Sequence, residues 1–452
     1  MTTSKIRQTD AIPAIILFFA IFSTFAASAR LAFEETAGGH MPVEADAPAS
    51  AGLEKVYVLW QTNGAKAVFT ADSPSEASAT KWYRFSNLGG GFAEEVRPVS
   101  QGSKSYVYLT GDDTGLIVES GGRQRCYWVV NYANHMCNLN ALDIAPEQEC
   151  DRTSLLLQGD AGKITYYSIN GVGQTLSREM NLEYNSMVYD EEQNRYVQTG
   201  INNTLESAET TIRTEAPLCD TDFTLSGDRF LKAWGMEKHV TSPTFTTGAI
   251  AVTTTALQTL RENDNEQKEE AALGGSGPVE ITFSAAMTDA VVYKEWQFSR
   301  DQEFNSIDLR IQEDEVVHEF DQQGTTYVRF VAGNDTGTCD YSGETYTVFI
   351  GESRLDCPNA FSPGATEGTN DEWKVSYKSI VEFDCHIFNR WGLEMAHLTN
   401  PSQGWDGRYK GKLVPAGVYY YVIKARGTDG KEYKKSGDIN IIKYKENGTR
   451  RN

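Results

Sequence analysis

The residues best suited to chemistry in the body of the chain, residues 30–356, are a histidine and a cysteine close together. His135 precedes Cys137 by two positions, a spacing that could pair a general base with a thiol nucleophile. No second orienting group accompanies them, and Cys126 is a nearby partner for the thiol. We therefore favour a disulfide with a surface histidine over a catalytic dyad.

Acidic side chains offer two further possibilities. Adjacent acids occur at Asp112–Asp113 and Asp190–Glu192, but a glycosidase needs two acids across a cleft, and a chain with 62 Asp and Glu contains such pairs without function. The segment Ala332–Asp340, AGNDTGTCD, gathers oxygen ligands that could hold calcium, although a plain turn is our preferred interpretation. Since H-E-x-x-H, G-x-S-x-G and phosphate-loop motifs are also missing from the body, we expect no catalytic site, no metal and no cofactor.

The chain has seven cysteines, which in an exported protein indicate disulfides with at least one thiol left over. No two form C-x-x-C, and the six histidines are scattered, so a structural zinc site is not expected. Local pairing predicts Cys126 with Cys137 and Cys150 with Cys219. The sequence leaves the pairing of the remaining three open; these are Cys339, Cys357 and Cys385.

The N-terminus has the layout of a secretory signal peptide. Lys5 and Arg7 precede an apolar run, Ala14 to Phe25, that ends in small residues through Ala29. A transmembrane helix needs about 20 apolar residues, so we predict cleavage after Ala29 rather than an uncleaved anchor. With 41 Lys+Arg against 62 Asp+Glu, the net charge of −21 argues against a nucleic-acid partner.

Apolar residues recur mostly at period two in short runs rich in Tyr, Val, Ile and Phe, which predicts antiparallel strands. The fold class is therefore all-β, with several immunoglobulin-like β-sandwich domains in tandem and a small C-terminal β-sandwich. We predict the following segments: a signal peptide (1–29), a linker (30–50), two sandwich domains (51–150 and 151–259), an acidic linker (260–277), a third sandwich (278–356), a terminal domain (357–445) and a tail (446–452).

The third sandwich resembles immunoglobulin-like domains of the polycystic-kidney-disease type. The resemblance rests on EWQFSRD, beginning at Glu295, and on HEFDQQGTTYVRFVAGNDTGTC, beginning at His318. In that family an aromatic strand, a glycine turn and a tyrosine strand make the core. A shorter echo, KWYRFSN at Lys81–Asn87, indicates that the first domain has a related architecture.

The terminal segment has the pattern of a compact β module. Between Val381 and Ile387 apolar and polar residues alternate, as in a strand with one dry face. NRWG and WDG then supply turns, and Pro415 leads through Gly417 into the strand that ends at Arg426. The local pattern predicts a small sandwich and no active site.

Five motifs in this segment resemble the gliding-motility-associated C-terminal domain, the type B sorting domain of the type IX secretion system of Bacteroidetes-type bacteria. In order they are CPNAFSPGATEGTND, HIFNRWG, WDGRYKGK, PAGVYYYVIKA and SGDINII. One departure is that Gly364-Ala365-Thr366-Glu367-Gly368 stands where members usually have Asn-Gly-Asp-Gly, which removes an expected cation ligand. The residues that carry the resemblance are Asn359, Phe361, Pro363, Asn370, Asp371, Phe388, Asn389, Arg390, Trp391, Gly392, Trp405, Asp406, Gly407, Pro415, Gly417, Tyr419, Tyr421 and Gly437.

The resemblance implies export across the outer membrane directed by the terminal domain, followed by retention at the cell surface without spanning the membrane. The implied partners are outer-membrane β-barrels of the secretion machinery, and other surface proteins are a further possibility. We expect a non-enzymatic protein that acts by contact as an accessory or signalling partner of that machinery. The alternative is a surface adhesin or glycan-binding protein, and a hydrolase without known motifs is a third possibility.

Overall fold

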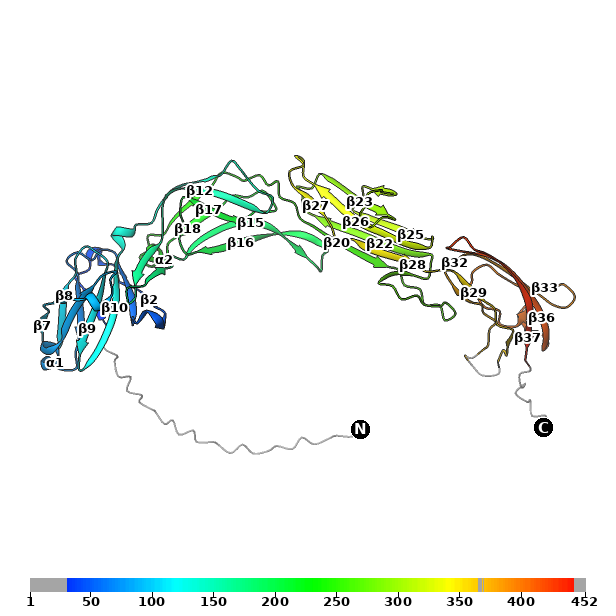
Figure 1. The fold of residues 1–452 in the computed structure, drawn as a ribbon, viewed down its shortest axis with the longest axis horizontal. Coiled ribbons are helices and arrows are strands. Elements are labelled where there is room, and N and C mark those ends of the chain that lie inside the picture. Colours follow the sequence, from blue (N-terminus) through cyan, green and yellow to red (C-terminus); the bar gives the residue numbers. More distant parts are fainter. Residues whose placement is uncertain (1–30, 365–367, 369, 443–452) are drawn as a thin grey trace, which may run out of the picture.

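The computed structural model describes residues 31–364, 368 and 370–442, and it shows four β-rich units that follow one another along a curved path (Figure 1). The all-β fold class is confirmed. The predicted signal peptide and the tail, residues 446–452, lie outside the described residues. None of the helices in the described part has the length and hydropathy of a membrane span.

The first unit, residues 31–131, is a sandwich of two sheets with strand orders β1-β4-β8-β7 and β2-β3-β10-β9-β5-β6. Apolar side chains, including those of Phe69, Trp82 and Tyr127, fill the space between the sheets. Strands β1 and β2 lie in the segment expected to be a linker, because Leu31 and Ala45 are buried against β4 and β3. The elements are β1 (Leu31–Glu34), β2 (Val43–Ala45), β3 (Lys55–Leu59), β4 (Lys66–Thr70), α1 (Pro74–Ala79), β5 (Lys81–Phe85), β6 (Glu94–Val96), β7 (Val99–Gln101), β8 (Lys104–Tyr108), β9 (Thr114–Ser120) and β10 (Arg123–Asn131).

The second unit, residues 138–241, has sheets ordered β11-β12-β17 and β16-β15-β18-β19, with the short pair β13-β14 beside them. Its longest element is the β15–β16 hairpin, which reaches the third unit through a hydrogen bond between Tyr196 Oη and Thr253 Oγ1. The elements are β11 (Asn138–Ile144), β12 (Arg152–Asp160), β13 (Ile164–Tyr167), β14 (Gly173–Leu176), β15 (Met180–Asp190), β16 (Arg195–Leu205), β17 (Thr211–Glu215), β18 (Thr224–Gly227), α2 (Arg229–Ala233) and β19 (Lys238–Thr241).

One buried ion pair stabilises the junction of the first two units. Arg178 Nη1 lies 2.5 Å from Asp228 Oδ2, and both side chains are almost fully buried. Asp228 also accepts a hydrogen bond from Tyr132 Oη at 3.1 Å and caps α2 through the Leu231 backbone N–H. Since Tyr132 follows the last strand of the first unit and the hydrophobic core is continuous across the junction, the two units share one interior.

The third unit, residues 252–350, is a sandwich of the sheets β20-β22-β25 and β21-β28-β26-β23-β24, with β27 paired to β26. Phe283, Trp296 and Phe330 are buried between the sheets. Strand β20 precedes the expected start of this unit, and it belongs here because it pairs with β22. The elements are β20 (Val252–Gln258), β21 (Leu273–Gly275), β22 (Val279–Met287), β23 (Tyr293–Ser299), β24 (Leu309–Ile311), β25 (Glu315–Phe320), β26 (Gly324–Gly333), β27 (Asp340–Ser342) and β28 (Tyr346–Ile350).

The predicted disulfide pairing was wrong. Cys150 bonds to Cys339, 189 positions away, and so connects the start of β12 in the second unit to the β26–β27 turn of the third. Pairing by nearness in sequence fails here because two units meet at this point. Cys126 and Cys137 are free and buried in the shared core, and burial raises the pKa of each thiol to about 11. Cys219 is also free.

The segment predicted as an acidic linker is attached to the terminal unit. Glu266 forms an isolated parallel β-bridge with Tyr377. In this bridge the Gln267 N–H donates to Tyr377 O at 2.7 Å and the Tyr377 N–H donates to Asn265 O at 3.1 Å. The Asn265 side-chain amide donates to Val375 O and Pro401 O, and Lys378 pairs with Glu269 at 2.5 Å. We call residues 263–269 the clasp, because they join the third unit to the fourth.

The fourth unit, residues 354–441, is built on a five-stranded sheet ordered β30-β37-β36-β32-β33. One face of this sheet packs on a core that contains Trp373, Trp405 and Ile423. Strand β32 alternates buried and less buried positions, as its sequence predicts. The elements are β29 (Arg354–Asp356), β30 (Ala360–Phe361), β31 (Ser376–Lys378), β32 (Ile380–Phe388), β33 (Glu394–Leu398), β34 (Arg408–Tyr409), β35 (Lys412–Leu413), β36 (Gly417–Gly427) and β37 (Glu432–Ile441).

The disulfide makes a prediction that peptide mapping can check. In the oxidised protein, digestion without reductant should release one peptide pair that joins Cys150 to Cys339, and Cys339→Ser should abolish it. The variant should also be cleaved faster in the connection between the second and third units, because their covalent link is gone. Cys219→Ser is the matched control and should leave the peptide pair unchanged. A pair joining Cys150 to Cys219 would contradict the structure.

The buried ion pair makes a second prediction. Asp228→Asn leaves the Arg178 guanidinium buried without its counter-charge, and removing one partner of such a pair costs about 3–5 kcal/mol of unfolding free energy. The matched control is Glu179→Gln, which removes the partly exposed partner of Arg229 and should cost at most about 1 kcal/mol. Denaturant unfolding of both variants measures the difference, and equal costs would show that the buried pair does not stabilise the junction.

Candidate recognition surface

The NRWG motif forms the turn between β32 and β33. The Asn389 side-chain oxygen accepts hydrogen bonds from the backbone N–H groups of Trp391 at 2.9 Å and Leu393 at 3.0 Å. Gly392 has a φ of +78°, the left-handed region that favours glycine. These two residues shape the turn, and the side chains of Arg390 and Trp391 between them are left exposed.

The WDG and PAG motifs form the base beside that turn. Trp405 is buried, donates its indole N–H to Arg408 O at 3.0 Å and contacts the Tyr419 ring edge-on at 5.2 Å. Tyr419 in turn donates its hydroxyl to Pro415 O at 2.9 Å. This chain of contacts fixes the start of β36 and therefore the position of the Pro415–Gly417 corner.

The turn and the corner enclose a groove of about 560 Å³. Its rim carries Trp391, which is 76% exposed, with the Arg390 guanidinium 4.5 Å from the centroid of the Trp391 ring. None of the described residues that line the groove is an acid, a histidine or a cysteine. The residues that line the groove are Asn389, Arg390, Trp391, Leu393, Met395, Tyr409, Val414, Pro415, Ala416, Gly417, Val418, Tyr419 and Tyr420.

The groove continues onto the outer face of the sheet. Val418, Tyr420 and Val422 point outward from β36 and are each 44–45% exposed, and Phe388 of β32 lies opposite Tyr420 in the strand register. A strand with one face in water normally has polar residues at its outward positions. We call these four side chains with the groove the recognition surface. It can bind an apolar or aromatic partner, and Arg390 adds one positive charge at its rim.

Other predicted motif residues build the domain. Phe361 packs against Trp405, and Pro363, Gly407, Tyr421 and Gly437 are buried or partly buried around them. At Gly437 a β-carbon would come within 2.7 Å of the Tyr421 hydroxyl, so Tyr421 needs glycine there. Burial raises the pKa of Tyr421 to about 12, so its hydroxyl stays protonated at neutral pH.

The remaining motif residues shape loops. Asp371 accepts hydrogen bonds from the Gly364 and Gly368 backbone N–H groups at 2.9 and 2.7 Å. Its oxygens are thus used within the loop in which the sequence departs from the family pattern; residues 365–367 and 369 of that loop lie outside the described part. Asp406 accepts from the Arg408 N–H, Asn370 adopts φ +54°, and Asn359 O receives the Asn440 N–H.

The catalytic possibilities in the body find no support in the described geometry. Burial raises the Cys137 pKa to about 11, which keeps the thiol protonated. The expectation that no orienting group accompanies His135 was wrong, because His135 Nε2 lies 2.7 Å from Asp113 Oδ2. In the Ala332–Asp340 segment, Asn334 Oδ1 accepts the backbone N–H groups of Thr338 and Cys339. That oxygen therefore closes the turn.

Sequence reasoning missed the outward residues of β36. The signal was present in the run Val418-Tyr419-Tyr420-Tyr421-Val422, which is apolar or aromatic at every position and does not alternate. Such a run predicts contact on both faces of the strand. The structure places Val418, Tyr420 and Val422 on the outer face.

Comparison with known families supports the terminal assignment. Residues 355–441 match the CHU_C type IX secretion signal domain, and residues 143–242 match a fibronectin type III domain, which is the second unit. No curated protein matches the sequence.

Three solved structures match the chain at low similarity. A tetra-tandem repeat of the extending region of a large adhesion protein is 10% identical, with 84% of this chain and 96% of that chain covered and a TM-score of 0.21. The FN1–FN3 domains of chicken CNTN1 are 11% identical, with 68% of this chain and 100% of that chain covered and a TM-score of 0.23. The immunoglobulin domains 1–5 of Sidekick-1 are 10% identical, with 85% of this chain and 78% of that chain covered and a TM-score of 0.24. No inference rests on these likenesses. From the family match, residues 355–441 are a type IX secretion signal domain, and the chain is a secreted cargo of that system.

Proposed function

We propose that this chain is a non-enzymatic, surface-retained protein that acts by contact as an accessory or signalling partner of the type IX secretion machinery. Outer-membrane β-barrels of that machinery recognise the fourth unit through the recognition surface. After export the chain stays on the outer face of the outer membrane, and the three upstream sandwiches are then free to contact other surface proteins.

The observation that carries this proposal is the position of Trp391. The chain has eight tryptophans, all within the described residues, and Trp391 is the exposed one among them. The buried base formed by Trp405 and Tyr419 fixes the far wall of the groove beside it. An exposed tryptophan with a stacked arginine, next to a rigid apolar groove, has the composition of a binding hot spot.

The second candidate function is a surface adhesin or glycan-binding protein. Its support is the string of sandwich units, of which one matches a fibronectin type III domain. Glycan binding by ring stacking needs exposed aromatic rings, and in residues 31–356 these are Phe92, Tyr108, Tyr293 and Phe349, dispersed over separate elements. Their dispersal favours the contact role over a stacking platform.

The recognition surface makes a testable prediction about export. In a host with a type IX system, Trp391→Ala should reduce the surface-exposed fraction of the full chain by at least about tenfold, since losing a hot-spot side chain costs 2 kcal/mol or more. The variant should accumulate in the periplasm, and its thermal unfolding should match that of the unmodified chain because Trp391 makes few packing contacts. The measurement is protease accessibility on intact cells.

Two controls make the result decisive. Phe92→Ala removes an exposed aromatic ring, 72% exposed, from the first unit and should leave export unchanged. Trp405→Ala should also abolish export, but for a different reason: truncating a buried tryptophan lowers the unfolding free energy by about 3–5 kcal/mol. Normal surface exposure of Trp391→Ala would overturn the proposed surface.

A photo-crosslinking amino acid at Tyr420 in the full chain, with one at Phe92 as control, would identify the partner. Capture of secretion barrels at position 420 alone supports the machinery role. Capture of glycans or proteins that do not come from the bacterial cell, together with glycan-array binding that is lost in Tyr108→Ala, would favour the adhesin function.

A further inference from the structure

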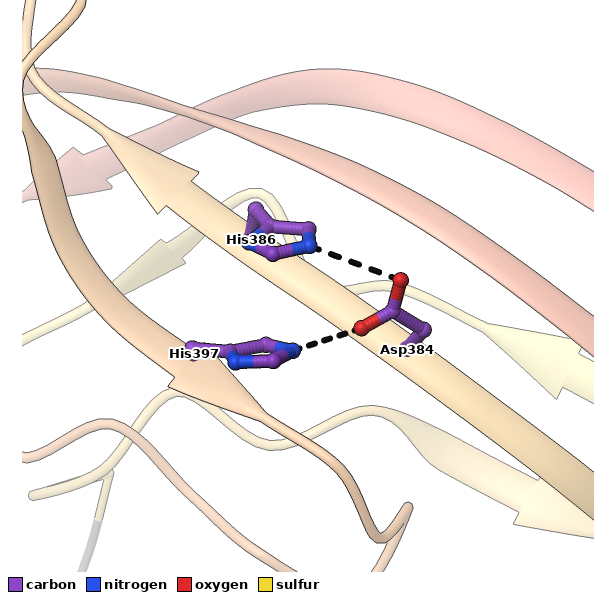
Figure 2. Close-up of side chains that lie close together, drawn as sticks. All are labelled: Asp384, His386 and His397. Carbon is purple, nitrogen blue, oxygen red and sulfur yellow. Dashed lines mark hydrogen bonds and ion pairs between the residues drawn. The ribbon is translucent and has the colours of Figure 1, made fainter.

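Two histidines and an aspartate meet on the outer face of the terminal sheet. Asp384 and His386 lie two residues apart on β32 and so project to the same side, and His397 lies on the edge strand β33 opposite His386. Figure 2 shows the two imidazole rings side by side, with the Asp384 carboxylate reaching both. Eleven positions separate the histidines in sequence, and the NRWG hairpin brings them together.

The donor atoms lie close enough for small side-chain movements to bring them to one metal ion. His386 Nε2 lies 3.4 Å and His397 Nε2 lies 2.6 Å from the nearest oxygens of Asp384, and one donor atom from each residue falls within 4.8 Å of the others. Tetrahedral bonds of about 2.0–2.1 Å place neighbouring donors ~3.3 Å apart. The His386 contact with Asp384 Oδ2 matches this spacing. His397 Nε2 forms a hydrogen bond with the other oxygen, Oδ1, and this contact must lengthen by ~0.7 Å when a metal ion replaces the shared proton.

A fourth residue orients one ligand. Glu394 Oε2 lies 3.0 Å from His386 Nδ1 and can accept the proton on that nitrogen. With the proton on Nδ1, the lone pair of Nε2 is directed toward Asp384 and is available to a metal. A carboxylate on the outer nitrogen of a ligating histidine is the usual supporting contact in protein metal sites.

The rings themselves are held in place by stacking. The ring centroids of His386 and His397 lie 4.2 Å apart, and the two ring planes are inclined by 10°. The Phe388 ring also stacks with the His386 ring, at a centroid distance of 6.1 Å. Both histidines are partly exposed, at 33% and 41% of their side-chain surface, so an ion can enter from solvent. The site is therefore accessible and largely formed in advance.

We propose that Asp384, His386 and His397 bind a divalent transition-metal ion, with Zn²⁺ the best fit, and that Glu394 is a positioning residue. The two imidazole nitrogens are borderline donors that suit Zn²⁺ better than Mg²⁺ or Ca²⁺, and Zn²⁺ also accepts a carboxylate oxygen beside two histidines. Three protein ligands leave one position for water or a partner's donor. The ion connects the edge strand β33 to β32. It lies close to the recognition surface, because the Phe388 ring of that surface stacks with His386.

The test is calorimetric titration of the untagged full chain, freed of metal, with ZnCl₂. The unmodified chain should bind one Zn²⁺ at this site, and His397→Ala or Asp384→Asn should weaken that binding by at least about tenfold, since even loss of an outer partner costs 10–100-fold. His239→Ala, an exposed strand histidine in the second unit, is the matched control and should bind normally. Unchanged affinity in both ligand variants would overturn the proposal.

Two further measurements separate a built site from loose surface binding. Glu394→Gln should weaken Zn²⁺ binding by about 10–100-fold while leaving the unfolding temperature of the metal-free chain unchanged. Co²⁺ should give the visible absorption of a tetrahedral nitrogen and oxygen site without thiolate charge-transfer bands, which would indicate cysteine ligands instead and contradict the assignment. These readouts use purified protein, so they stand whether or not Trp391→Ala alters export.

Discussion

The register of strands β32, β36 and β33 is the constraint on which the terminal unit depends. Each residue of a strand faces one side of its sheet, so a slip of one position would exchange the two faces. In the observed register Cys385, Ile387 and Ile423 are buried. The same pairing places His386 opposite His397 and Phe388 opposite Tyr420 on the outer face. Burial of the core thus also decides which side chains a partner or an ion can reach.

The connections between the units are firmer than those of domains on free linkers. A shared core joins the first two units, a disulfide joins the second to the third, and the clasp joins the third to the fourth. In the clasp, Asn265 and Gln267 contact Tyr377 through backbone hydrogen bonds. The acidic residues Asp264 and Glu269 form ion pairs with Lys374 and Lys378 of the fourth unit. The terminal unit is therefore held at its β31 side and at the β36–β37 turn, where the Gln323 N–H donates to Thr428 O. The recognition surface lies at the other end of β36.

Much of the fold was predictable, because strand alternation and turn residues are local signals. The expected strand between Val381 and Ile387 is observed as β32, and the expected strand ending at Arg426 is observed as β36. Long-range relations were not predictable. The Cys150–Cys339 bond and the clasp depend on where two units meet, and a single sequence records no such distance. The histidine pair needed the hairpin register, which follows only once NRWG is known to turn the chain between its two strands.

The construction of the groove bears on when the terminal domain can be recognised. One wall comes from residues 389–395 and the other from residues 409–420, and the buried Trp405 and Tyr419 hold the second wall in place. An extended chain would separate these walls and would also separate Asp384 from His397. A receptor that binds both walls at once therefore binds a folded domain, and it can do so only after the fourth unit has folded. In the proposed recognition the buried motif residues are therefore required together with Trp391, because the surface does not exist without the core beneath it.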